Sequence, residues 1–301
     1  MRARHLTRSV RDRVPAVARA LRAVYIAWAR LTARWRMTPD FLIVGAQRSG
    51  TTTLFRVLSE HPNVVRPTFS KGIAYFDLNY HRGMRWYRAH FPLRIVARRK
   101  TRGPAYTFES VGYYMFHPLA AERIARDLPG VKLVVMVREP VERAYSAHRH
   151  ELMRGFETED FETALALEEE RTAGEAARIV ADPSYQSHAL RHHAYLARSR
   201  YSEQIQRLVD LVGEERVHVV DADRFFADPA AEYALLNDWL GLPAWVPENV
   251  EKWNARARDP LSPELRARLT EYFRPYDEEL ARLMGRTPLW RRRSDPPTGG
   301  R

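Results

Sequence analysis

Phe41-Leu-Ile-Val-Gly-Ala-Gln-Arg-Ser-Gly-Thr-Thr-Thr53 is the stretch that decides the fold. Its four leading apolar residues predict a buried parallel strand, and residues 51–61 predict a helix that Pro62 ends. Between them, Gly45 to Gly50 form a loop. Such a loop points backbone N–H groups and the positive end of a helix at one spot, which favours a bound phosphate.

The loop differs from the P-loop of nucleotide triphosphatases at one position. Both glycines of G-x-x-x-x-G-K-[ST] are present, but Thr51 stands where the lysine belongs and Arg48 is the cation. A second predicted strand, 132–137, runs into Arg138 rather than a metal-binding aspartate. The loop therefore favours an anionic donor that reacts without a bound metal, and no metal site is predicted. A P-loop kinase is the weaker alternative.

A second phosphate element follows that strand. Arg138 ends it, Pro140 suits the first position of a helix over 141–152, and Ser146 lies in the second turn. A guanidinium and a hydroxyl placed in this way suit a second, separate phosphate.

The remaining chain alternates strands with helices. A third strand is expected at 217–220, and helices at 118–128, 161–171, 188–212, 229–240, 263–273 and 277–284, with Glu168 to Glu170 on a solvated helix face. This order predicts an α/β fold in which helices flank both faces of a mostly parallel central sheet that carries the P-loop-like loop.

Positive charge is concentrated outside the body of the chain. The net charge is +12, yet residues 1–37 hold ten Arg against one Asp, and residues 286–301 hold five Arg against one Asp. The nearly neutral body disfavours a nucleic-acid partner. The chain has no cysteine, which excludes disulfides and thiolate metal sites and fits a reducing compartment, so a cytoplasmic location is predicted.

The N-terminal segment predicts a basic amphipathic helix within residues 1–37. Its apolar residues recur in steps of three, four and seven at Val14, Val17, Leu21, Val24, Trp28, Leu31 and Trp35. The helix either packs on the body or a partner, which is favoured, or makes peripheral contact with an anionic membrane. We expect the catalytic domain at 38–290 and a disordered tail at 291–301. A cluster of Arg94, Arg98, Arg99, Lys100 and Arg102 is expected in a solvated loop, or facing an acidic glycan or lipid headgroup.

With these two phosphate elements, the chain resembles the sulfotransferases that use 3′-phosphoadenosine-5′-phosphosulfate (PAPS), in the heparan sulfate and bacterial branch. The resemblance covers 39–290 and rests on Pro39 to Thr52 and on Val137-Arg-Glu-Pro-Val-Glu-Arg-Ala-Tyr-Ser146, with flanking matches such as Tyr75-Phe-Asp77 in family order. It implies in-line transfer of a sulfuryl group from PAPS to a hydroxyl or amine of a carbohydrate, lipid or small molecule. A non-catalytic relative that only binds the nucleotide is the alternative.

The resemblance also implies roles for individual residues. Arg48 would contact the bridging region of the donor and stabilise charge on the leaving phosphate, while Tyr201 would lie near the nucleotide. Arg138 and Ser146 would bind the 3′-phosphate. The 5′-phosphate would be held by Gln47, Ser49, Gly50, Thr51, Thr52 and Thr53, and a loop with Arg256 and Arg258 would close over the donor.

The general base of the heparan sulfate branch is missing by position. That branch has a glutamate directly after the lysine aligned with Lys71, where this chain has Gly72, and a further family lysine aligns with Ser110. Glu109 is the first candidate for the base, and Asp77 and His81 are weaker ones. Lys71 is expected to stabilise the transferring sulfuryl group.

Overall fold

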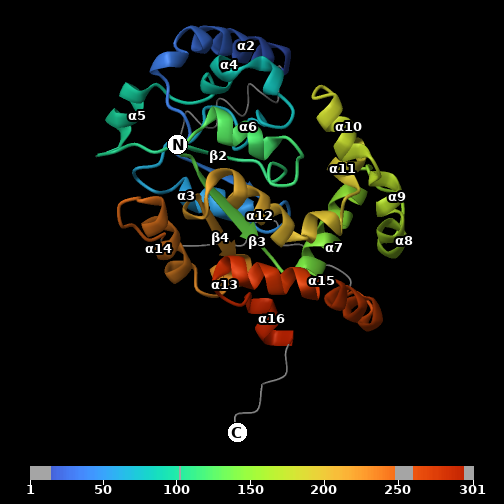
Figure 1. The fold of residues 1–301 in the computed structure, drawn as a ribbon. Coiled ribbons are helices and arrows are strands. Elements are labelled where there is room, and N and C mark those ends of the chain that lie inside the picture. The colour runs from blue at the N-terminus through green and yellow to red at the C-terminus, as the bar shows by residue number, and fades with distance from the viewer. Residues whose placement is uncertain (1–14, 102, 248–259, 295–301) are drawn as a thin grey trace.

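A four-stranded parallel sheet lies at the centre of the structure, a computed structural model that describes residues 15–101, 103–247 and 260–294. The strand order is β2 (Phe108–Ser110), β1 (Phe41–Gly45), β3 (Lys132–Val137), β4 (Val217–Asp221) (Figure 1). All three pairings are parallel, which confirms the predicted α/β fold. β1 is hydrogen-bonded on both sides, so the loop that follows it begins from a fixed position.

Helices cover both faces of this sheet because successive strand residues point to opposite sides. Leu42 and Val135 pack with α6 (Ala120–Asp127) and α12 (Tyr201–Val212) in one core cluster. Ile43 and Val134 pack with α3 (Thr51–Leu58) and α14 (Pro229–Leu240) in another. The all-apolar strands of the sequence are therefore buried on two sides.

Two predicted helices are broken, and one buried carboxylate accounts for part of the break. Residues 161–171 form α8 (Phe161–Ala166) and α9 (Glu168–Thr172), while 188–212 splits into α11 (His188–His192), η3 (Ala197–Ser199) and α12. Glu168 is buried and accepts hydrogen bonds from the backbone N–H groups of Tyr195, Leu196 and Ala197. The expectation that Glu168 lies on a solvated face was wrong.

In the C-terminal part, two predicted helices are joined instead of broken. The two helices expected at 263–273 and 277–284 form one, α15 (Pro263–Met284), with Pro275 inside it. It packs with α7 (Pro140–Met153) and α8 in a third core cluster. α13 (Ala222–Ala227) follows β4, and α16 (Leu289–Ser294) continues four residues past the predicted end of the domain.

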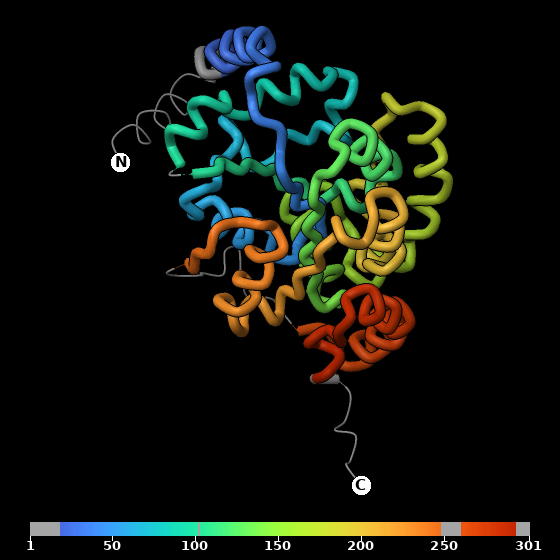
Figure 2. Tube along the Cα trace, turned by 60° about the vertical axis from the view of Figure 1, so that its left-hand side comes forward, coloured from blue at the N-terminus to red at the C-terminus, as the bar shows by residue number. Residues whose placement is uncertain are grey.

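The N-terminal helix α2 (Pro15–Leu31) continues into η1 (Ala33–Trp35) and packs beside α4 (Met84–Arg88). In Figures 1 and 2 it lies at one end of the molecule, opposite α15 and α16. Residues 94–100 form a helix, α5 (Arg94–Lys100), rather than the expected loop. Short elements complete the described chain: η2 (Tyr80–Arg82), α10 (Glu175–Ala181) and η4 (Glu214–Arg216). Among the described helices, none has the length and apolarity to cross a bilayer.

Candidate active site

The loop after β1 turns back sharply to the start of α3. Arg48 and Gly50 have positive φ angles, 74° and 99°. The φ of Gly50 favours glycine, and a Cβ atom there would also be tight, at 3.1 Å from the ring of Phe226. The Ala46 N–H donates to the carbonyl of Met136 on β3 at 2.8 Å, which fixes the loop to the sheet.

The first turn of α3 faces this loop without a side-chain cap. Its N-cap is Gly50, which has no side chain to accept from the N–H groups of the first turn. These N–H groups carry the positive end of the helix dipole. The Thr52 hydroxyl beside them accepts a hydrogen bond from Lys71 Nζ at 3.0 Å. The arrangement suits an anion with several oxygens.

The two phosphate elements of the sequence meet directly. Arg48 Nε donates to Ser146 Oγ at 3.1 Å, although the residues are 98 positions apart. Ser146 is placed by α7, which begins at Pro140 and is capped by Glu139, whose carboxylate accepts from the Val141 and Glu142 N–H groups. The loop and the helix after β3 thus form one polar site.

Arg138 directly follows β3 and leads into α7. Its Nη2 pairs with Glu142 Oε2 at 3.3 Å, one turn along α7. Its carbonyl accepts from the hydroxyl of the buried Tyr201 at 3.0 Å. Burial raises the pKa of Tyr201 to about 12, so the hydroxyl keeps its proton and ties α12 to the strand end.

The side chain of Lys71 brings a second cation to the start of α3. Its pKa is lowered to about 8, first because burial disfavours the charged ammonium and then because the Arg56 charge repels it. The ammonium therefore titrates close to neutral pH.

Glu109 is fully buried on β2, and both of its oxygens accept hydrogen bonds. Oε1 accepts from the N–H groups of Ile73 and Ala74 and from the Tyr114 hydroxyl at 3.0 Å, and Oε2 accepts from the Tyr87 hydroxyl at 2.8 Å. Burial raises its pKa to about 7, against these four donors. The carboxylate holds the segment that follows Lys71. The sequence contained Tyr87 and Tyr114 but no pattern that paired them with Glu109.

The two weaker candidates for the base have different surroundings. Asp77 is buried, and burial raises its pKa, with Arg191 and Arg123 near enough to oppose the rise. Its Oδ1 accepts from the Leu78 N–H, whereas its buried Oδ2 has no hydrogen-bond partner among the described residues. His81 lies exposed in η2.

Gly72 has no room for a side chain. A Cβ atom there would lie 2.8 Å from the carbonyl oxygen of Ser110 and 3.0 Å from Val111. The Lys71 carbonyl accepts from the Ser110 N–H at 2.8 Å, so this close approach is fixed by a backbone hydrogen bond. The local backbone thus excludes a glutamate at 72 as long as the two segments pair in this way.

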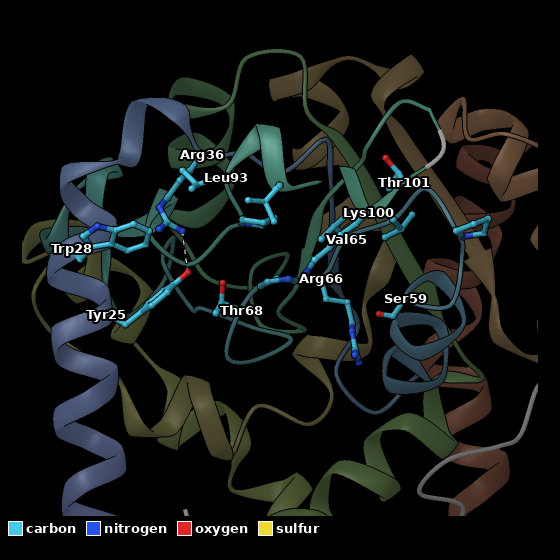
Figure 3. A pocket seen from close by; sticks show the side chains of 15 residues that line it. Tyr25, Trp28, Arg36, Ser59, Val65, Arg66, Thr68, Leu93, Lys100 and Thr101 are labelled. Carbon is cyan, nitrogen blue, oxygen red and sulfur yellow. Dashed lines mark hydrogen bonds between the residues drawn. The ribbon is translucent and has the colours of Figure 1, made fainter. Parts of the chain in front are cut away.

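The other predicted site residues fall into two groups. Ser49, Thr51 and Thr53 are buried in the loop and first turn with Gln47 beside them, whereas Arg256 and Arg258 lie outside the described residues. No cluster of His, Asp or Glu suited to a metal ion occurs in the described ranges. A cavity of about 570 Å³ lies elsewhere, at the Ser59 end of α3 (Figure 3). None of residues 45–50 of the phosphate loop lines it.

Comparison with known proteins agrees with this geometry. The sulfotransferase domain family matches residues 38–281, which include both phosphate elements and every described candidate residue. The chain belongs to the sulfotransferase family. This sulfotransferase is also similar to a solved sulfotransferase from Alicyclobacillus acidocaldarius, with 29% identity and a TM-score of 0.58 over 83% of this chain and 97% of the other.

Two curated relatives extend the comparison. The sulfotransferase is 25% identical over 276 residues to heparan sulfate glucosamine 3-O-sulfotransferase 5 of Homo sapiens, covering 84% of this chain and 74% of that protein. It is 24% identical over 319 residues to the membrane-associated sulfotransferase kil1 of Dictyostelium discoideum, covering 84% and 66%. The predicted enzyme class, a sulfuryl-transferring enzyme, is confirmed.

Proposed function

We propose that this sulfotransferase takes its sulfuryl group from PAPS and places it on a carbohydrate. The observation that supports PAPS as the donor is the hydrogen bond between Arg48 and Ser146. It joins a loop suited to one phosphate to a helix suited to another. PAPS carries a 5′-phosphosulfate and a separate 3′-phosphate, so a donor with two anionic ends matches a site with two adjoining cationic elements.

The residues present fit this donor. The first turn of α3 has no side-chain cap, and Arg48, Lys71 and Thr52 lie beside it. These groups would hold the 5′-phosphosulfate, with Gln47, Ser49, Thr51 and Thr53 in the same loop and turn. Arg138 and Ser146 would hold the 3′-phosphate. PAPS supplies the sulfuryl group when it is bound.

Each cation has a separate task in the transfer. Arg48 lies beside the uncapped helix start, where positive charge stabilises the oxygen of the leaving phosphate. Lys71 donates to Thr52 in the same place and, as an ammonium, stabilises charge on the transferring sulfuryl oxygens. The acceptor oxygen or nitrogen forms the new bond to sulfur as the bond from sulfur to the phosphate oxygen breaks, and the acceptor gives up a proton.

We assign Glu109 to positioning rather than to removal of that proton. Its carboxylate has no exposed surface and both oxygens are occupied, so an acceptor has no route to it in this conformation. Asp77 is also buried, but its Oδ2 is not engaged by any described residue, so Asp77 is the candidate that would be free to take the proton once the segment around it opened. Burial also raises the pKa of Asp77, which brings a carboxylate closer to the pH at which a base works best.

The acceptor class rests on the relatives. One of them is named as a sulfotransferase of heparan sulfate glucosamine, which supports a carbohydrate hydroxyl or amine over a lipid or a small phenol. A cytoplasmic location stays a prediction from the sequence.

Calorimetry with adenosine 3′,5′-bisphosphate, in buffer with a metal chelator, tests the donor. We expect saturable binding that falls about 10- to 100-fold in Arg48→Ala and in Arg138→Ala, because each removes charge-assisted hydrogen bonds. Arg282→Ala is the control, since Arg282 is exposed on α15 and pairs with Glu279. Binding that is absent in the unmutated protein, or equal in all variants, contradicts the donor assignment.

Transfer of labelled sulfate to a panel of glycans, lipids and phenols tests the reaction. We expect label on glycans that contain amino sugars, dependent on Arg48. Nucleotide binding without transfer to any member would favour the non-catalytic alternative. Transfer of phosphate from ATP would favour the kinase alternative.

A further inference from the structure

A surface that is both basic and apolar lies at the α2 end of the molecule, away from the active site. We call it the α2–α5 surface. Its exposed apolar side chains are Leu21, Val24, Trp28, Leu31 and Trp35 from α2 and η1, and Ile95 and Val96 from α5. Its cations are Arg19, Arg22, Arg30, Arg34, Arg94, Arg98, Arg99 and Lys100.

The apolar residues of α2 form one face that does not pack on the body. Their steps of three and four residues place them on the same side of the helix. Leu21 is 61% exposed, Val24 69% and Leu31 71%. The helix docks instead through Ala29 and Ala33, which are buried. Tyr25 also packs on the body, with its ring 5.1 Å from that of Phe69, so the large side chains of α2 that remain available are those of the exposed face.

α5 belongs to the same surface because the chain around residue 36, directly after η1, is hydrogen-bonded to the segment that leads into α5. Arg36 Nη1 donates to the Phe91 carbonyl at 2.7 Å, and the Met37 N–H donates to the Pro92 carbonyl at 2.9 Å. Trp28 of α2 and Lys100 of α5 line one cavity from opposite sides, as Figure 3 shows. Apolar and cationic groups from both helices thus lie around a common opening.

The charge of this region contrasts with the rest of the body. Residues 13–39 and 78–108 contain no Asp or Glu, while residues 109–285 carry 32 acids against 22 Lys and Arg. These two segments supply many cations and no acid of their own, although Asp40 lies near Arg94, and such a surface attracts a polyanionic partner. Exposed leucines and tryptophans beside them need an apolar environment, which an acidic glycan does not offer and a bilayer interface does.

We propose that the α2–α5 surface docks on an anionic lipid bilayer, with α2 lying in the plane of the interface. Leu21, Val24 and Leu31 enter the boundary between headgroups and acyl chains. The cations of α5 meet lipid phosphates and carboxylates. The enzyme is then held at a membrane without a spanning segment among its described helices.

Sedimentation with vesicles tests the proposal. The full chain should bind vesicles of phosphatidylcholine with phosphatidylserine and not vesicles of phosphatidylcholine alone. Leu21→Ser with Leu31→Ser should weaken binding on the order of tenfold or more. Arg98→Gln with Arg99→Gln should weaken it about thirtyfold, from roughly a fivefold loss for each cation.

Matched controls use exposed residues on other helices. Val180→Ser with Leu235→Ser removes side chains that are 57% and 55% exposed on α10 and α14, and Arg268→Gln with Arg282→Gln removes cations of α15. Both controls should bind vesicles like the unmutated chain. All variants should bind adenosine 3′,5′-bisphosphate equally, so a failure of the proposed enzyme function leaves the vesicle result standing.

Three outcomes would overturn the proposal. One is no binding to anionic vesicles. Another is vesicle binding that the apolar pair of substitutions leaves unchanged while soluble heparin abolishes it, which would assign the surface to an acidic glycan. The third is a dimer in light scattering that Leu21→Ser with Leu31→Ser dissociates, without vesicle binding, which would assign it to a second copy of the chain.

Discussion

Replacing Glu109 by Gln and by Ala separates positioning from proton removal. Gln keeps an oxygen that accepts from the Ile73 and Ala74 N–H groups, and its amide group donates to a tyrosine hydroxyl. We therefore expect Glu109→Gln to fold and to keep turnover within about threefold, since loss of a true general base costs on the order of 10²–10⁴-fold.

Glu109→Ala should destabilise the fold instead. It leaves the donors of Ile73, Ala74, Tyr87 and Tyr114 without their acceptor in a fully buried place. The two backbone N–H groups alone cost about 1–3 kcal/mol each, so the free energy of unfolding should fall by about 4 kcal/mol. Urea denaturation followed by tryptophan fluorescence measures this loss.

The pH dependence of stability gives an independent check. The pKa of Glu109 is about 7 in the folded chain against an ordinary 4.5, so the folded state binds the proton more tightly than the unfolded state. The free energy of unfolding should fall as pH rises from about 4.5 to about 7, by about 3 kcal/mol in total. Glu109→Gln should remove this share of the slope and leave the shares of Glu139 and Asp277, whose pKa values burial raises to about 7 and about 6.

One result would refute the positioning role. If Glu109→Gln keeps the stability and nucleotide binding of the unmutated protein but loses a hundredfold or more in kcat, Glu109 removes the proton. Asp77→Asn is the matched comparison, and we expect it to show that loss.

The other predictions concern the loop and its neighbours. Because Lys71 acts as a cation with a pKa of about 8 in the free protein, kcat/KM should fall as pH rises through about 8, and Lys71→Arg should remove the fall; a value of kcat/KM that increases through this range would make Lys71 a base. Ser146→Ala removes the acceptor of Arg48 Nε and should weaken binding of adenosine 3′,5′-bisphosphate about five- to tenfold in calorimetry without changing Tm; unchanged binding would contradict the shared site. Gly72→Ala should lower the free energy of unfolding by about 1–3 kcal/mol because its Cβ meets the Ser110 carbonyl, whereas Gly103→Ala, with its nearest neighbour 3.5 Å away, should not. Gly72→Glu should not raise turnover, and a gain would show that the loop can open.

The central sheet could be predicted because its signals are local. The strands at 41, 132 and 217 are apolar on both faces, and Pro140 and Gly241 mark helix ends that the structure confirms. β2 was missed because it has only three residues, one of them Glu109. The breaks between 188 and 212 were missed because Glu168, 27 to 29 positions earlier, binds the N–H groups there, and periodicity carries no sign of a distant acceptor.

Some residues of the candidate site could likewise be predicted from local motifs, and others could not. Arg48, Arg138 and Ser146 stood in short motifs and were therefore named from the sequence, whereas the hydrogen bond between Arg48 and Ser146 across 98 residues was not predicted. The surroundings of Glu109 did not, since Tyr87 and Tyr114 come from separate segments whose approach depends on the folded core. Whether a carboxylate next to a strand is exposed or enclosed is decided by that packing.

The low pKa of Lys71 has a consequence for its chemical reactivity. At pH 7 an amine with a pKa of about 8 is free base in roughly one molecule in ten, whereas an ordinary lysine is so in about one in three thousand. The chain has only four lysines, Lys71, Lys100, Lys132 and Lys252. Lys71 is therefore set apart as the lysine that an acylating reagent of small size labels first, and a nucleotide that covers it protects it. Peptide mapping of that label reads the occupancy of the donor site directly, without any knowledge of the acceptor.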